Sequence, residues 1–113
     1  MAWIYLVVAG LFEIGWPLGL KLGWTPDGLR AWPLAISIAC MTASGGFLLL
    51  AQRTLPMGTA YAVWTGIGAV GTFFVGLVMF KEPATAARFL CVGLIAGGIV
   101  GLKLVSDAAA AQP

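Results

Sequence analysis

The sequence contains few of the side chains that bind metals, form cross-links or carry out catalysis. Histidine is absent, cysteine occurs twice, and only 9% of the 113 residues are charged. Without histidine or an acidic cluster there is no metal-ligand spacing, and no arrangement of nucleophile, base and metal predicts an enzyme or a cofactor. Cys40 and Cys91 both lie inside apolar segments, which predicts reduced thiols in place of a disulfide framework.

No part of the chain carries a cluster of charged residues. The net charge is +2, and the basic residues are spread along the chain, so no basic stripe predicts nucleic-acid binding. The residues that dominate are apolar, because 61% of the chain is hydrophobic and the mean hydropathy is +1.02. These values lie well outside the range of soluble domains, and they predict an integral membrane protein.

Four apolar segments fill almost the whole chain. Each is close to the roughly 20 residues that a helix needs to cross the hydrocarbon layer. The sequence therefore predicts an all-α membrane protein with a single domain at residues 1–105 and a short disordered tail at 106–113. No basic leader precedes the first segment, so we expect that segment to be retained and not cleaved as a signal peptide. The predicted transmembrane helices are residues 2–21, 31–51, 58–80 and 86–105.

A bundle of four short helices is too thin to enclose a polar cavity and shield it from lipid, so we expect oligomerisation. Gly93, Gly97 and Gly101 recur every four residues in the last segment and predict a flat dimer contact. General enrichment of glycine in membrane helices is the alternative explanation. The basic residues divide four against two between the two sides of the membrane, a weak bias that permits insertion in both orientations.

Glu13 lies near the middle of the first apolar segment, residues 2–20, which contains no lysine, arginine or histidine. A charged side chain at membrane depth costs roughly 2.5–3.5 kcal/mol even on lenient scales, so such a residue usually marks a proton, ion or substrate path. On a helix, Gly10, Trp16 and Pro17 lie one turn away from it. Because Pro17 lacks a backbone N–H, we expect a bend at this turn.

Polar aromatic residues in the third segment are candidates to surround this carboxylate. Tyr61 and Trp64 share one helix face, and a phenol and an indole need hydrogen-bond partners when they are buried. Gly66 and Gly68 weaken the middle of the same helix, as expected of a segment that bends between two states. Aromatic packing beside a glycine-lined helix crossing is the alternative.

In the second segment the polar candidates are Thr42 and Ser44. Hydroxyls in membrane helices commonly bond to their own helix, so either one taken alone is more often structural than functional. Gly45 follows Ser44 and leaves the helix surface open. That position predicts either a side opening for the tail of a substrate or close packing against protein, and the sequence leaves both interpretations in place.

Two motifs resemble those of the small multidrug resistance transporters. After Glu13, the chain reads W-x-x-G-L-K from Trp16 to Lys21, and the third segment reads P-M-G-T-A-Y-A-V-W-T-G-I-G-A from Pro56 to Ala69. The resemblance covers residues 1–105, and the third-segment motif is specific to this family. Within the family, the tryptophan three residues after the glutamate is similar to the guanidinium-exporter subtype.

The resemblance implies a dimer of two oppositely oriented copies in the bacterial inner membrane, with both Glu13 carboxylates in one site that opens to each side in turn. It implies that Glu13 binds substrate or protons, that Trp16, Ser44 and Trp64 form its hydrogen-bonded shell, and that Tyr61 helps to switch the site. The implied activity is antiport of a guanidinyl cation, with protons as the coupling ion and no cofactor.

Pro17 and Gly45 depart from the commoner family pattern around the site entrance, while Gly10 would give the shell room. We therefore expect substituted cations, such as guanylurea or alkylguanidines, to fit beside guanidinium. Three alternatives remain at this point. The chain could export quaternary ammonium or other hydrophobic cations, act as a non-transporting membrane subunit, or work as a heterodimer with a paired homologue in place of a homodimer.

Overall fold

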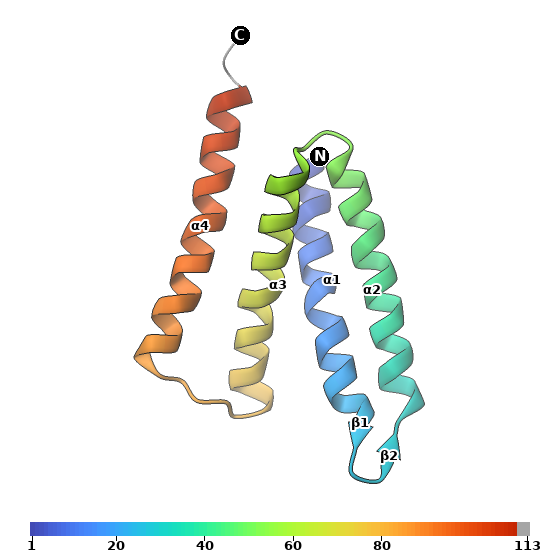
Figure 1. Ribbon diagram of the computed structural model, residues 1–113. Helices are drawn as coiled ribbons and strands as arrows, with labels where there is room; N and C mark the ends of the chain where they lie inside the picture. The colour runs from blue at the N-terminus through green and yellow to red at the C-terminus, as the bar shows by residue number, and fades with distance from the viewer. Residues whose placement is uncertain (111–113) are drawn as a thin grey trace.

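The computed structural model describes residues 1–110, and the side chains of residues 1–107, as four long helices and one small hairpin (Figure 1). All four helices are long and apolar enough to cross a membrane, which confirms the predicted all-α membrane class. The first three helices begin and end within two residues of their predicted bounds. The elements are α1 (Ala2–Gly23), β1 (Trp24–Thr25), β2 (Gly28–Leu29), α2 (Ala31–Gln52), α3 (Met57–Met79) and α4 (Ala86–Ala110).

The last helix continues beyond its predicted end. The segment that we expected to be a disordered tail from residue 106 is helical as far as Ala110, and residues 111–113 lie outside the described part of the chain. Two local features explain the extension. The segment is rich in alanine, the best helix former, and the Lys103 ammonium lies 2.8 Å from the Asp107 carboxylate, one turn further along.

The loop between α1 and α2 is a tight antiparallel hairpin. Trp24 pairs with Leu29 and Thr25 pairs with Gly28. The Thr25 hydroxyl donates a hydrogen bond to the Gly28 carbonyl over 2.6 Å, and Gly28 adopts a φ of 123°. Because a side chain is strained at that φ, glycine is required there. The hairpin turns the chain back, so that α2 runs antiparallel to α1.

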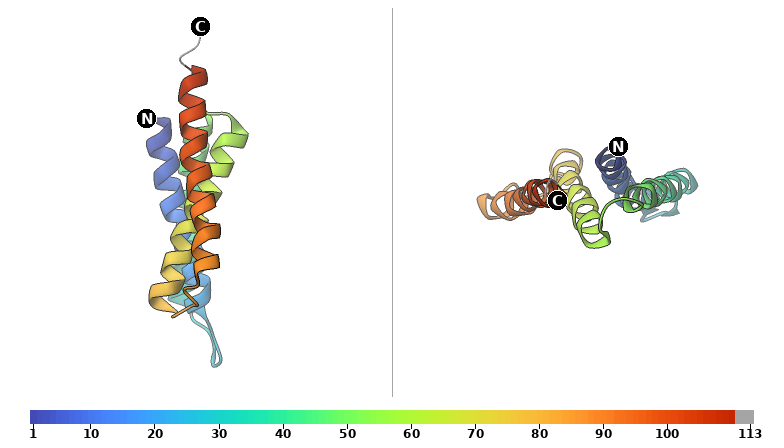
Figure 2. Two further views of the ribbon diagram at one scale, coloured as in Figure 1. Left: turned by 90° about the vertical axis from the view of Figure 1, so that its left-hand side faces the viewer. Right: turned by 90° about the horizontal axis from the view of Figure 1, so that it is seen from above.

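Helix α1 lies between α2 and α3, whereas α4 packs chiefly against α3 (Figure 1). Seen from above, the helices form an open row and not a closed ring (Figure 2). The principal-axis extents are 60 × 34 × 16 Å, and the smallest is little more than the roughly 10–12 Å diameter of one helix with its side chains. A single chain is therefore a thin slab.

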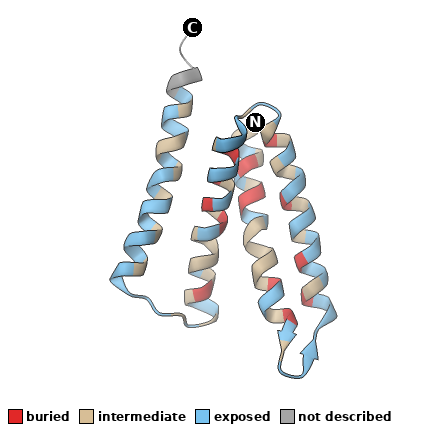
Figure 3. Cartoon of the chain, in the orientation of Figure 1, coloured by how far each residue is buried: buried red, intermediate tan, exposed pale blue. Residues whose placement is uncertain are grey.

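The apolar core lies at the end of the bundle that contains the N-terminus and the α2–α3 loop. Leu6, Ala51, Ala60 and Val63 are buried there. Helix α4 differs from the others, because none of its described residues is buried (Figure 3). Its exposed surface follows from its place at the edge of the row, where only one of its faces meets another helix.

Candidate substrate site around Glu13

Glu13 lies on α1, partly buried, inside a chain of hydrogen bonds that joins three helices. The Trp16 indole N–H donates to Glu13 Oε1 over 2.6 Å. The Ser44 hydroxyl of α2 lies 3.2 Å from Glu13 Oε2, and the Trp64 indole N–H of α3 donates to Ser44 Oγ over 2.8 Å. The structure thus brings together Glu13, Trp16, Ser44 and Trp64, as the family resemblance implies.

Two serines hold α2 against α1 at this level. Ser37 donates to the Trp16 carbonyl over 2.8 Å, and Ser44 donates to the Ala9 carbonyl over 2.7 Å. Both hydroxyls are buried, and each bonds to the backbone of the neighbouring helix instead of its own. Ser37 was not identified from the sequence. Its spacing of seven residues from Ser44, which places both on one helix face, is the signal that could have found it.

Ser44 has more acceptors than hydrogens. Its hydroxyl carries one hydrogen, but the Ala9 carbonyl oxygen and the Glu13 carboxylate are both within reach, at 2.7 Å and 3.2 Å. The Trp64 N–H occupies one lone pair of the Ser44 oxygen. The two acceptors therefore compete for one hydrogen while Glu13 is ionised. The competition ends when Glu13 is protonated, because its O–H can then donate to the Ser44 oxygen.

No basic side chain neutralises Glu13. The ion pairs in the described part of the chain join Lys21, Arg88 and Lys103 to other carboxylates. The only hydrogen-bond donors to Glu13 within residues 1–107 are the neutral Trp16 and Ser44 side chains. An ionised Glu13 would therefore need a cation from outside the chain as its counter-charge.

The carboxylate borders an open groove between α1 and α3 of about 260 Å³. Gly68 forms part of its wall, and a Cβ at that position would lie 2.6 Å from Glu13 Cγ, so only glycine leaves room for the glutamate. Thr65 and Thr72 were not identified from the sequence, although their spacing of seven residues places them on one helix face. The groove is lined by Glu13, Pro17, Thr65, Gly68, Ala69 and Thr72.

The structure does not bring Tyr61 to the carboxylate. Its side chain is 55% exposed and contacts Trp64, with the ring centroids 5.3 Å apart. In a single chain it therefore lies outside the hydrogen-bonded shell, on a surface that is free to meet another molecule.

The other predicted gating positions divide between packing and open surface. Gly66 does not line the site, because a Cβ there would lie 2.6 Å from Ile99 Cδ1 of α4. Gly10 likewise packs against α3, because a Cβ there would lie 2.7 Å from Ile67 Cβ. Pro17 lies inside α1 without ending the helix and lines the groove. Gly45 is exposed and has nothing within 4 Å of a Cβ, so it borders open space beside Ser44.

Comparison with known proteins gives one consistent result. The family model described as Small Multidrug Resistance protein matches residues 1–95. A protein of Yersinia pestis named Guanidinium exporter is 53% identical over 106 residues, which are 94% of this chain and 100% of that protein. Proteins with the same name from Citrobacter freundii and Salmonella typhimurium strain LT2 are 53% and 50% identical over 104 residues, 92% of this chain and 97% of each relative.

Proposed function

We propose that this chain, which belongs to the small multidrug resistance family, exports guanidinium and small guanidinyl cations in exchange for protons. It is a multi-pass membrane protein, and we place it in the bacterial inner membrane with its relatives. Similarity to guanidinium exporters over more than nine-tenths of the chain supports the substrate class. The observation that carries the proposal is Glu13, a carboxylate without a basic partner that is fixed by two neutral donors beside an open groove.

The geometry of the carboxylate suits a guanidinyl head group. A guanidinium is planar and offers pairs of N–H donors whose spacing matches the two oxygens of a carboxylate. Trp16 and Ser44 hold Glu13 in one orientation, so less conformational freedom is lost on binding. Quaternary ammonium ions have no N–H donors and would depend on contact with aromatic faces instead, which makes them weaker substrates of this site.

The single hydrogen of the Ser44 hydroxyl explains how cation binding at Glu13 is coupled to proton binding. When Glu13 binds a proton, its O–H donates to Ser44, whose own hydrogen stays on the Ala9 carbonyl, so the described hydrogen bonds are all satisfied without substrate. When Glu13 loses the proton, its oxygens need donors that Ser44 cannot fully supply. A guanidinyl cation provides them. Proton and cation therefore compete for the same oxygens, and such competition is sufficient for antiport.

We further propose that the working unit is an antiparallel dimer. The slab shape leaves the groove beside Glu13 open, so a second chain is needed to separate the site from lipid. On α4, Gly93, Gly97 and Gly101 have nothing within 4 Å of a Cβ, which suits close approach of another helix. The nearly balanced loop charges allow opposite insertion of identical copies, and a paired homologue is the alternative partner.

In that dimer two Glu13 carboxylates would face one site. If both were protonated in each cycle, two protons would exchange for one monovalent cation. Tyr61 lies on an exposed face beside Trp64, from which it would reach the partner copy and help to switch the site. Gly45, next to Ser44, borders open space through which the substituent of guanylurea or of an alkylguanidine would extend.

Reconstitution of the purified chain in liposomes tests the proposal. We expect electrical currents with guanidinium, guanylurea and alkylguanidines, weak or no current with tetrapropylammonium, and weaker cation binding as the pH falls. Glu13→Gln is the control, because it keeps the shape of the side chain but cannot be ionised. Coupled transport should be lost in that variant. Binding that does not depend on pH would contradict proton exchange, and unchanged transport in Glu13→Gln would remove Glu13 from the mechanism. Absence of current with the unmodified chain would favour a non-transporting subunit.

A further inference from the structure

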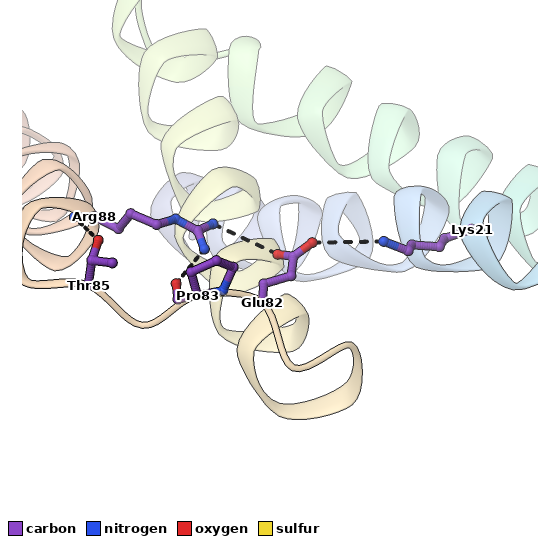
Figure 4. A network of polar contacts seen from close by, with 5 residues as sticks. All are labelled: Lys21, Glu82, Pro83, Thr85 and Arg88. Carbon is purple, nitrogen blue, oxygen red and sulfur yellow. Dashed lines mark hydrogen bonds and ion pairs between the residues drawn. The ribbon is translucent and has the colours of Figure 1, made fainter.

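The two ends of the helix bundle differ, because ion pairs between the helices are found at only one of them within residues 1–107. The end near the N-terminus contains the buried core of Leu6, Ala51, Ala60 and Val63. At the opposite end, the loop between α3 and α4 places the Glu82 carboxylate between two basic side chains, Lys21 of α1 and Arg88 of α4 (Figure 4). We call these three residues the Glu82 clasp. The first end is closed by apolar packing. At the second end the Phe73 and Phe89 rings pack α3 against α4, and ion pairs of Glu82 add the link to α1.

The loop holds Glu82 in a defined place on α3. The backbone N–H of Glu82 donates to the Gly76 carbonyl over 3.2 Å, and a Cβ at Gly76 would lie 2.8 Å from the carboxyl carbon of Glu82. Only glycine leaves this surface flat enough for the carboxylate to rest on it. Lys81 adopts a φ of 53° to turn the chain, a conformation that non-glycine residues rarely take. Arg88 also donates to the Pro83 carbonyl.

The carboxylate is shared between two cations. Glu82 Oε2 lies 3.8 Å from Lys21 Nζ, and Glu82 Oε1 lies 3.8 Å from an Arg88 guanidinium nitrogen. The Lys21 ammonium also lies 4.5 Å from the centre of the Phe80 ring. Through these contacts one side chain connects α1, the end of α3 and the start of α4.

The clasp stands at the end of the groove that leads to Glu13. A smaller cavity of about 120 Å³ includes Lys21 and Glu82 in its lining. This cavity shares Pro17 and Thr72 with the groove beside Glu13. The two spaces therefore adjoin along α1 and α3, and a solute that moved from Glu13 toward this end of the bundle would meet the clasp.

We propose that the Glu82 clasp is the gate at this end of the α1–α3 groove, closed when Glu82 is paired with Lys21 and Arg88 and open when the loop releases α1. The side chains of Lys21, Glu82 and Arg88 are 56%, 37% and 37% exposed. Ion pairs at such exposure contribute little to stability and are weakened by salt. A closure of this strength can break in every transport cycle, while the apolar core at the other end stays packed.

This inference rests on the proposed antiparallel dimer in one respect. Oppositely oriented copies would place one clasp at each face of the membrane. If one clasp opens while the other stays closed, the shared site is exposed to one side at a time. Glu82 then has a gating role, and Glu13 keeps the role of binding cations.

Accessibility of the groove tests the gate without substrate. We would introduce Thr72→Cys into a chain that carries Cys40→Ala and Cys91→Ala, insert it into lipid nanodiscs and measure the rate of reaction with a neutral, water-soluble methanethiosulfonate. Adding Glu82→Gln should raise this rate roughly threefold to tenfold, because the two ion pairs are lost. Asp107→Asn, which removes the exposed pair with Lys103 on α4, is the matched control and should leave the rate unchanged.

Two further results complete the test. Lys21→Gln should also raise the rate, and the double variant Lys21→Gln with Glu82→Gln should react no faster than Glu82→Gln alone, because both remove the same pair. High salt should speed the reaction only in chains that retain Glu82. Equal rates in all folded variants, checked by size-exclusion chromatography, would overturn the gate. Because the assay needs no transport, its failure is distinct from failure of the guanidinium-export proposal.

Discussion

Helices α1 to α3 and helix α4 use the same kinds of residue in opposite ways. In the first group, most glycines lie against neighbouring side chains within the chain, as Gly10 does with Ile67 and Gly68 does with Glu13, and only Gly45, Gly46 and Gly58 border open space. On α4, Gly93, Gly97, Gly98 and Gly101 have nothing within 4 Å of a Cβ. The same contrast holds for polar groups, because both hydrogen bonds to Glu13 found within residues 1–107 come from α1 and α2.

The difference indicates that the two groups of helices have different roles. Three helices hold the carboxylate in place, and no buried side-chain polar atom in the part of the chain that the structure describes lacks a hydrogen-bond partner. The fourth helix presents a surface that nothing in the chain covers. Gly97 is two residues from both Ile95 and Ile99, which pack on α3 at Gly66, so it faces away from α3. That surface is available to a second copy.

Adding one methyl group to each of the two regions should show the largest difference in stability between them. A Cβ at Gly19 would collide with the Ser37 hydroxyl and lie 2.7 Å from the Pro33 carbonyl oxygen, which belongs to the backbone and cannot move aside. We expect Gly19→Ala to destabilise the protein by about 1–3 kcal/mol. Thermal unfolding in detergent measures this effect. The matched variant Gly97→Ala should unfold like the unmodified chain, and equal destabilisation by both would contradict the difference in roles.

A larger side chain on α4 should affect association and not folding. Gly97→Leu would remove the flat surface that close helix approach requires. We expect it to weaken dimerisation on the order of tenfold, about 1.4 kcal/mol, as measured by sedimentation equilibrium in detergent, with unchanged helix content. Gly58→Leu, at another position with nothing within 4 Å of a Cβ, is the control. If Gly97→Leu still formed the dimer with unchanged affinity, α4 would be excluded as the dimer contact.

Single alanine substitutions distinguish the role of the Ser44 hydroxyl from that of the nearby Thr42 hydroxyl. Ser44→Ala would leave the Trp64 N–H and the Ala9 carbonyl without their partner, a loss of about 1 kcal/mol or more. We expect roughly fivefold to tenfold weaker guanidinium binding, measured by isothermal titration calorimetry. Thr42→Ala should have no effect, since the Thr42 hydroxyl bonds only to the Ile38 carbonyl of its own helix. Identical affinities in both variants would exclude Ser44 from the site.

The smallest expected effect concerns the size of the substrate. Gly45→Phe would fill open space beside Ser44 without touching the hydrogen bonds to Glu13. Guanidinium currents should therefore change less than twofold, whereas currents of alkylguanidines should fall. The ratio of the two currents in liposomes is the measurement. If both currents fell equally, Gly45 would act on folding or gating and not on substrate size.

Much of the site could be predicted from local spacing. Trp16 lies three residues after Glu13 on the same helix, and the structure joins them over 2.6 Å. Tyr61 shows where local spacing fails, because it shares a helix face with Trp64 but stays exposed. The periodicity of a helix states which residues lie together on one face. It does not state which neighbour that face meets, as Gly66 illustrates, because within one chain it lies against Ile99 of α4.

The sequence alone determined the membrane class and the four helices and singled out Glu13 as a candidate binding residue, because hydrophobic length and the high free energy of a buried charge depend only on local composition. Only the tertiary structure decided that Ser44 reaches the carboxylate and Trp64 reaches Ser44, that Ser37 fixes α2 to α1, and that Glu82 lies between Lys21 and Arg88. Those contacts join residues far apart in the chain, and their geometry depends on how the helices pack.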